Sequence, residues 1–216
     1  RVYIVINEAR LRRVDGDIHI PTFSMSMSLD VDSWTWSFSA SLPWQALPLV
    51  DLSSVDPVEV EATINGVAYR FLVEKIGTER TFGSNTVRVS GRGKSAFLDS
   101  PYAPSMFFGN TTSRTAQQLM GDVLTLNGVP LDWTVNWGIT DWVVPGNVWT
   151  HQGSYISALT NIAAAPGAYI QPHPTLQQLY VLPRYPVMPH QWGDLTPDFD
   201  IPSAVMTREG IERNDL

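Results

Sequence analysis

The segment Ser90-Gly-Arg-Gly-Lys-Ser95 is the part of this chain that comes nearest to a motif for chemistry. Glycine-rich loops ending in Gly-Lys-Ser bind phosphate, because their main-chain N–H groups and the lysine surround the phosphate oxygens. Such a loop needs a glycine five residues before the Gly-Lys pair, and Arg88 occupies that position. The segment also follows a strand of antiparallel type, without a parallel strand–helix–strand unit. We therefore interpret the glycines as part of a turn at a strand end, and predict no nucleotide site.

Two pairs of carboxylates, Asp15 with Asp17 and Asp30 with Asp32, have a spacing that also occurs in calcium loops. A calcium loop of the EF-hand kind needs further oxygen ligands at fixed positions and a closing glutamate. Both pairs stand instead at turn signals, where aspartate is common because its side chain bonds to the local main chain. The sequence therefore predicts no metal site and no cofactor.

The histidines are His19, His151, His173 and His190, and none has a partner at the spacing of a metal site. The sequence contains no His-Glu-x-x-His and no Gly-x-Ser-x-Gly motif. A glycosidase needs only two well-placed carboxylates, but the acidic residues here stand mostly in turns and hairpins. We predict no catalytic residue and a protein that is not an enzyme.

Eight tryptophans and seven tyrosines offer another kind of chemistry, the stacking of aromatic rings on the apolar faces of sugars. The same residue types dominate the buried area of cores and protein interfaces. We favour core and interface packing. A carbohydrate-binding host-recognition module with exposed tryptophans is kept as the alternative function.

The stretch from Ser33 to Leu42 shows the kind of element that positions these rings. Two tryptophans, a phenylalanine, an alanine and a leucine alternate there with five hydroxyl residues. This period of two predicts a strand with one apolar face and one uncharged hydroxyl face. We expect the apolar face to pack on a core, and the hydroxyl face to meet solvent or another protein.

Composition limits the classes of protein that fit. The 216 residues suffice for one large β domain or two small ones. Charged residues make up 16%, below the roughly 25% of typical soluble domains, which favours a component of an assembly. The net charge of −7 argues against wrapping nucleic acid, but suits a surface along which DNA slides. Cysteine is absent, so disulfides and thiolate sites are excluded, and no apolar run is long enough for a membrane helix.

Residues 1–100 are predicted to be β structure throughout. Alternating or β-branched runs occupy 2–6, 18–20, 23–29, 58–64, 67–73 and 86–90. Asn65-Gly66 separates two of these runs, and this dipeptide is the strongest short signal for a hairpin. Because turns are frequent and no helical period occurs, we expect an antiparallel β-barrel or sandwich.

Residues 101–190 are predicted to form a small α+β domain with two helices. The first helix is expected over 112–126, with a hydroxyl N-cap and a stop at Asn127-Gly128. The second is expected after Gly153-Ser154, ending at Pro166-Gly167. A hairpin of 168–170 and 179–182 follows, around Pro172-His-Pro174.

Residues 191–216 are predicted to be a proline-rich extended segment. The chain begins with Arg1 and stops in a charged stretch, 208–215. We therefore expect more protein beyond Leu216. The fold class predicted for the whole is a β-rich α+β protein, an antiparallel β-barrel followed by the small α+β domain.

In their order along the chain, these pieces resemble phage tail hub proteins. The pattern comprises the strand ending at Leu42-Pro43, then 67–76, 89–99, the helix start at 115–119, Trp142-Val-Val-Pro-Gly146, 168–172 and 182–186. The resemblance is to the hub proteins of Mu-like and other long-tailed phages. More distantly the chain is similar to the T-even baseplate hub and the late-control protein D family. The resemblance covers essentially the whole chain, and it rests on the order of the pieces.

The resemblance implies a structural role at the tail tip of a virion. Such hubs carry two related β-barrel tube domains per chain, and three chains form a pseudo-sixfold ring. The ring joins the tail tube to threefold tip proteins, and genome DNA passes through its lumen without specific binding. The implied partners are two further copies of the chain, tail tube and distal tail proteins, and central tip or spike proteins. Only one barrel, 1–100, and the α+β domain after it are matched here, so 191–216 is expected to lead to a missing or second barrel half. The family brings no catalytic or metal residue to these domains.

Overall fold

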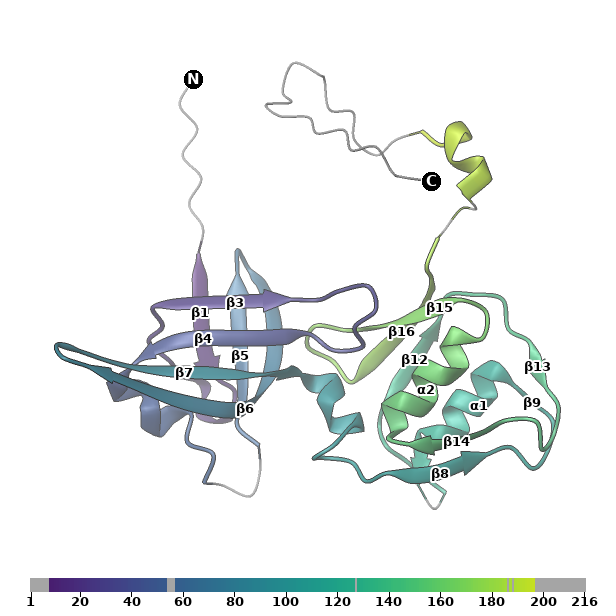
Figure 1. Ribbon diagram of the computed structural model, residues 1–216, viewed down its shortest axis with the longest axis horizontal. Coiled ribbons are helices and arrows are strands. Elements are labelled where there is room, and N and C mark those ends of the chain that lie inside the picture. Colours follow the sequence, from purple (N-terminus) through teal and green to yellow (C-terminus); the bar gives the residue numbers. More distant parts are fainter. Residues whose placement is uncertain (1–7, 54–56, 127, 186, 188, 197–216) are drawn as a thin grey trace, which may run out of the picture. The chain divides into compact units, whose positions relative to one another are not determined.

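The alternating sequences of the first part of the chain form a seven-stranded antiparallel sheet in the computed structural model (Figure 1). The structure describes residues 8–53, 57–126, 128–185, 187 and 189–196. The strand order is β2–β1–β5–β6–β7–β4–β3. The bounds are β1 Ala9–Arg13, β2 Ile18–His19, β3 Ser24–Ser28, β4 Ser37–Pro43, β5 Glu59–Ile64, β6 Val67–Thr81 and β7 Ser84–Gly93.

The sheet curls around a core formed by its inward-facing residues. In Figure 1, β1 and β5 cross behind β3 and β4. The core side chains alternate along each strand and include Leu11, Phe38, Leu42, Val60, Phe71 and Val89. The end strands, β2 and β3, are not paired with each other, so the described strands form a curled open sheet where a barrel was expected.

The hairpin predicted at Asn65-Gly66 is confirmed. Ile64 and Val67 pair directly on either side of it, between β5 and β6. Asn65 and Gly66 have φ angles of 50° and 84°, the positive values that a type I′ turn requires.

The strand predicted over 33–42 is shorter than expected at its start. Strand β4 begins at Ser37, and its Phe38, Ala40 and Leu42 are buried as the alternation predicted. The two tryptophans before it pack against different hydrophobic cores. Trp36 packs against the core of the sheet, and Trp34 packs against a second core described below. A regular strand places both rings on one face, so the chain leaves the strand geometry here.

The hairpin of β6 and β7 is longer than the two predicted strands. It continues from Glu74 to Asn85 through mostly polar residues, in which Ile76 and Phe82 are the large apolar ones. Pairing runs to Thr81 and Ser84, on either side of a turn at Phe82-Gly83. Because a two-stranded extension buries little apolar surface, hydrophobic alternation gives no signal for it.

The second part of the described chain contains two α-helices and nine short strands. Helix α1 spans Ala116–Val123 and α2 spans Tyr155–Ala164. The strands are β8 Met106–Gly109, β9 Arg114–Thr115, β10 Thr125–Leu126, β11 Val129–Pro130, β12 Thr134–Trp137, β13 Val143–Val144, β14 Thr150–Gly153, β15 Ala168–Pro172 and β16 Gln178–Pro183. Along the whole described chain, the short 3-10 helices are η1 Asp15–Asp17, η2 Trp44–Leu49, η3 Lys94–Leu98 and η4 Pro189–Asp194.

The two helices begin at residues whose side chains satisfy free main-chain N–H groups. Thr115 caps α1 in a reciprocal capping box with Gln118, so the predicted start at 112 is wrong by one turn. The predicted end at 126 is also wrong, because the helix ends at Val123 and 125–126 form β10. Residues 114–115 instead form β9, which pairs with β13. Ser154 caps α2, as predicted.

Both helices bury one face in the second core. This core contains Leu119, Met120, Ile156, Leu159, Ile162, Leu179 and Val181. The predicted hairpin is confirmed as β15 and β16, and β12 pairs with β16 in parallel. The β15–β16 turn reaches the first sheet, where the main-chain N–H of Arg70 donates to Pro174 at 2.8 Å.

The described residues up to Arg184 belong to one compact unit, and those from Tyr185 onward belong to another. In the latter, η4 forms over 189–194, where an extended segment was predicted from 191. The strand predicted at 2–6 and most of 191–216 lie outside the described residues. The domain boundaries at 100 and 190 stay predictions. No helix in the described ranges has the length and apolar character needed to span a membrane.

Candidate functional site

The Ser90–Ser95 segment crosses from the end of β7 into η3. Pairing between β6 and β7 is irregular here, with Val73 opposite Gly91 and Lys75 opposite Ser90, so Glu74 is an extra residue. A Cβ added to Gly91 would lie 1.7 Å from the carbonyl oxygen of Leu72. Gly91 is therefore required by the close approach of two strands. The Lys94 ammonium lies 3.3 Å from Glu59, which further supports a structural role for the segment.

The aspartate pairs form local turns and ion pairs. Asp15 and Asp17 lie in η1, where Asp17 has a φ of 53° and pairs with Arg12. Asp32 pairs with Arg184. In the part of the chain that the structure describes, no three His, Cys, Asp or Glu side chains gather as a metal site would need.

The histidines are separated, and two of them hold local structure. The Nδ1 of His173 accepts hydrogen bonds from the main-chain N–H groups of Thr175 and Leu176, at 3.1 and 3.0 Å, and so closes the β15–β16 turn. The Nε2 of His151 lies 2.9 Å from the hydroxyl of Ser157.

The tryptophans pack against the two cores. Trp34, Trp133, Trp137, Trp142 and Trp149 are partly buried on the second core, and Trp36 and Trp44 on the first. Trp192 is the exposed one, and its ring is tilted by 56° against that of Tyr185. The row of open rings that the carbohydrate-binding alternative needs is therefore not found among the described residues.

An ion-pair cluster around Arg92 was not predicted from the sequence. The Arg92 guanidinium donates to both oxygens of Glu74, with a shortest distance of 2.8 Å, and to Asp99 at 3.0 Å. The hydrogen bonds to Glu74 raise the pKa of Arg92. Burial raises the pKa of Asp99, but hydrogen bonds from Ser154 and Arg92 outweigh it and leave that pKa below its usual value.

A second ion-pair cluster surrounds Glu61 on β5, which is 6% exposed. Arg12 donates to one of its oxygens at 2.7 Å and Arg70 to the other at 3.0 Å. Burial raises the pKa of Glu61, and the hydrogen bonds from both arginines outweigh it and lower the pKa below 4.5. These carboxylates are ionised and paired at neutral pH, which suits a structural role better than proton transfer.

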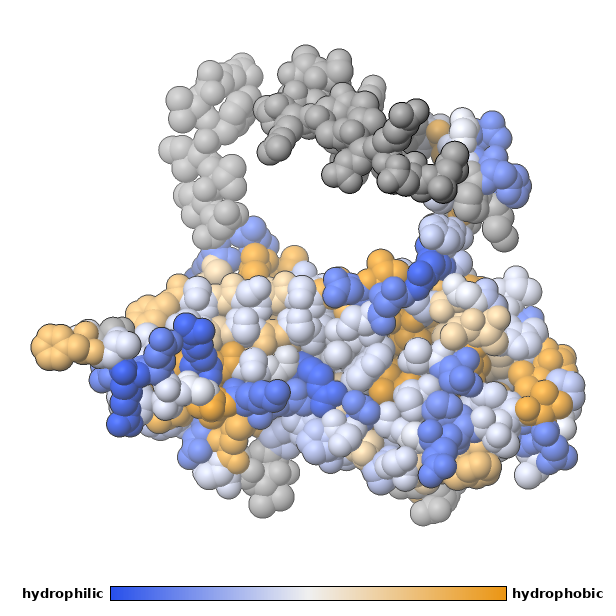
Figure 2. All heavy atoms as spheres, in the orientation of Figure 1, coloured by the Kyte–Doolittle hydropathy of each residue, from blue (hydrophilic) through white to orange (hydrophobic). Residues whose placement is uncertain are grey.

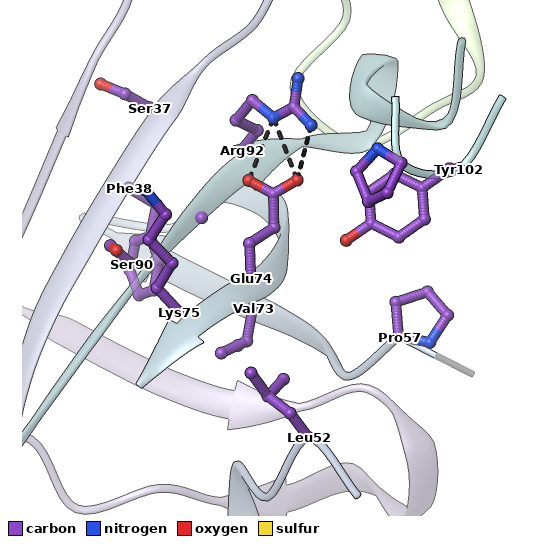
Figure 3. A pocket seen from close by; sticks show the side chains of 12 residues that line it. Ser37, Phe38, Leu52, Pro57, Val73, Glu74, Lys75, Ser90, Arg92 and Tyr102 are labelled. Carbon is purple, nitrogen blue, oxygen red and sulfur yellow. Dashed lines mark hydrogen bonds and ion pairs between the residues drawn. The ribbon is translucent and has the colours of Figure 1, made fainter. Parts of the chain in front are cut away.

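A hollow of about 750 Å³ lies beside the Arg92 cluster. Figure 3 shows the Glu74–Arg92 pair on one side, Phe38, Val73 and Leu52 on others, and the Tyr102 ring at the edge. Burial raises the pKa of the Tyr102 phenol, so it stays neutral. Its walls are apolar, and the charges of Glu74 and Arg92 are paired with each other, whereas Lys75 in the lining has no ion pair among the described residues. The hollow is therefore suited to an apolar group with an acidic residue near it.

The outward face of β3 and β4 carries the predicted hydroxyl groups. Directly opposed pairs are Ser24 with Ser41, Ser26 with Ser39, and Ser28 with Ser37. The last pair is hydrogen-bonded at 2.7 Å. Figure 2 shows this face as a pale area of intermediate hydropathy over β3 and β4. We call it the serine face.

Strand β3 is an end strand of the sheet, and its sequence carries no protection against pairing. Residues 23–29 contain no charged residue and no proline, and β3 pairs with β4 without a bulge. At the other end, β2 has only two residues and follows the tight turn of η1. Edges without charge, proline or bulges pair readily with other strands, so β3 is the open edge of this sheet.

Comparison with solved structures finds this fold in tail proteins. The tail protein from Neisseria meningitidis MC58 matches with a TM-score of 0.59 and 16% identity, over 81% of this chain and 50% of that one. The 43 kDa tail protein of prophage MuSo2 from Shewanella oneidensis matches with a TM-score of 0.52 and 15% identity, over 82% and 54%. A chain of a PdpA–VgrG complex matches with a TM-score of 0.51 and 8% identity, over 84% and 36%.

The chain spans about half the length of the two tail proteins. No protein-family model and no curated protein matches its sequence. At these identities the likeness establishes the fold alone, which this chain shares with the two tail proteins.

Proposed function

We propose that this chain is a structural, non-enzymatic component of a phage tail tip. In this proposal three copies form a hub ring, which joins the tail tube to the threefold tip proteins and lines the DNA channel. The likeness in fold to two tail proteins supports the tail assignment. The order of sequence pieces that resembles tail hubs supports the position in the ring.

The observation that carries the proposal is the open edge β3. A sheet that ends in an uncharged, regular edge strand is prone to uncontrolled pairing unless another chain covers it. A ring in which each sheet continues into its neighbour covers that edge in every subunit. The low charge content of the chain, 16%, agrees with a surface that is partly covered.

The serine face supplies a second argument for the ring. Its three opposed serine pairs are neutral, and the whole chain carries a net charge of −7. A channel lined by such a surface exerts little attraction on phosphate groups. DNA therefore slides past without being held.

The proposal is tested by the mass and symmetry of the protein. We expect a trimer in solution at high concentration, and a threefold ring on the axis of an intact tail by electron microscopy. A protein that stays monomeric and is absent from the tail axis contradicts the proposal.

A further inference from the structure

We propose that the tip of the β6–β7 hairpin, which carries Phe82, docks into the apolar hollow beside Leu52 of a second copy of this chain. The proposal rests on the ring assembly described above and specifies a contact that holds its subunits together. It concerns an interaction between side chains, separate from main-chain pairing along β3.

The hairpin tip is an exposed apolar anchor. The Phe82 side chain is fully exposed, at the end of two paired strands. Figure 1 shows these strand ends reaching beyond the other strands of the sheet, and Figure 2 shows an apolar group projecting there. The hairpin is held close to its tip, because the Arg80 guanidinium lies 4.4 Å from the centre of the Trp44 ring. A large aromatic ring held on an ordered hairpin is the kind of residue that dominates binding at protein interfaces.

The hollow has the properties required to receive such a ring. Phe38 and Val73 form apolar walls, and Leu52 on the rim is 38% exposed. Tyr102 offers a further aromatic surface (Figure 3). The volume of about 750 Å³ exceeds what one phenylalanine occupies, so the flanking residues of a hairpin tip also fit.

A chain cannot fill its own hollow with its own Phe82. The hollow lies at Lys75 of β6, and Phe82 follows directly after the end of this strand, so the two are separated by about 23 Å along the hairpin. Folding the tip back would break the pairing of β6 with β7. In the proposed contact the tip of one copy therefore meets the hollow of another through unlike surfaces, and such head-to-tail contacts generate closed rings when the rotation closes.

Lys75 of the hollow and Glu79 of the tip provide one pair of opposite charges between the two surfaces. Lys75, on the rim of the hollow, is exposed and has no ion pair among the described residues. Glu79, near the tip, is half-exposed and pairs with Arg88 at 3.0 Å on the open surface. An exposed ion pair of this kind contributes little to the stability of the fold. Glu79 can therefore leave Arg88 and pair with Lys75 of the second copy at a small cost in free energy.

The test uses disulfide trapping, since the chain contains no cysteine. Chains carrying Phe82→Cys are mixed with chains carrying Leu52→Cys and oxidised. A disulfide requires Cα atoms within about 7 Å, so it forms efficiently only if tip and hollow meet. The matched control replaces Phe107, which is 72% exposed on β8, by cysteine and pairs it with Leu52→Cys. We expect a cross-linked dimer from the first mixture and only background from the second.

A second measurement uses chains without new cysteines. By analytical ultracentrifugation, Phe82→Ala should weaken self-association about 10- to 100-fold, while Phe107→Ala leaves it unchanged. Equal cross-linking in both mixtures, or an unchanged association of Phe82→Ala, overturns the proposal. So does a Phe82→Cys chain that cross-links to another tail protein and not to Leu52→Cys. If the tail contains a threefold ring of this chain but the cross-link does not form, the hub function is supported and this contact is refuted. If the cross-link forms but the chain has no place in the tail, the contact is supported and the hub function is refuted.

Discussion

Replacing Gly91 by alanine tests whether the Ser90–Ser95 segment serves strand pairing. The added Cβ would stand 1.7 Å from the Leu72 carbonyl oxygen and 2.9 Å from its carbon, whereas real Cβ contacts are essentially never closer than 3.0 Å. Strands β6 and β7 must therefore separate by about 1 Å at the extra residue Glu74.

The loss of stability in Gly91→Ala follows from the contacts that this separation of the strands breaks. Overpacking costs about 1–3 kcal/mol, and each weakened main-chain hydrogen bond adds about 1 kcal/mol. We expect Gly91→Ala to lower the free energy of unfolding by about 3–5 kcal/mol, a large part of the 5–15 kcal/mol typical of domains.

The matched control is Gly77→Ala in the same hairpin. Gly77 has no atom within 4 Å of an added Cβ, and its φ lies outside the left-handed region. The substitution should leave stability unchanged or raise it by up to about 1 kcal/mol, because it restricts the unfolded chain. Gly93→Ala, with Trp36 at 3.2 Å, should fall between the two.

Urea unfolding followed by tryptophan fluorescence measures these differences. With a slope of about 2 kcal/mol per molar, Gly91→Ala should lower the midpoint by about 2 M relative to Gly77→Ala. Equal midpoints for the two variants would refute the account of Gly91 as a close-approach glycine.

Three further predictions follow from the edge, the buried carboxylate and the first helix cap. Ser26→Lys on the open edge should shift the protein towards monomer in sedimentation velocity, while His19→Lys on the short edge β2 should not. The lowered pKa of Glu61 contributes stability that is present above its usual value of 4.5 and is lost as pH falls through the lowered value. Glu61→Gln should therefore flatten the acid limb of the stability profile and cost about 1–3 kcal/mol at pH 7. Thr115→Ala should cost about 1 kcal/mol in urea unfolding and Thr112→Ala almost nothing.

Each of these has an opposite outcome that counts against it. An unchanged oligomer for Ser26→Lys removes β3 from the interface. If the stability of Glu61→Gln and that of the wild type fall equally steeply as the pH is lowered, other carboxylates control acid unfolding. If Thr112→Ala lowers the free energy of unfolding more than Thr115→Ala does, the helix begins at 112 and not after Thr115.

The elements that the sequence predicted well are those specified by local chemistry. Asn65-Gly66 identified its hairpin, because few residues tolerate a positive φ at both positions. Ser154 identified the start of α2, because its hydroxyl satisfies a free N–H. Helix α1 was predicted too long, because Thr112 and Thr115 are both acceptable caps and only pairing of β9 with β13 selects the second.

The contacts that the sequence did not predict join residues far apart in the chain. Strand β12 pairs in parallel with β16, and nothing in either short segment specifies that partner. The ion-pair cluster beside the hollow brings Glu74, Arg92 and Asp99 together at an extra residue in β6. The exposed Phe82 follows Arg80 and Thr81 in a polar stretch, and only pairing of β6 with β7 turns it into a projecting tip.

The most direct test of the central claim is electron microscopy of an intact tail containing this chain. The account predicts a threefold ring on the tail axis, with each sheet continued at β3 and a central channel beside the serine faces. A chain located off the axis, or present as isolated monomers with β3 uncovered, would contradict it.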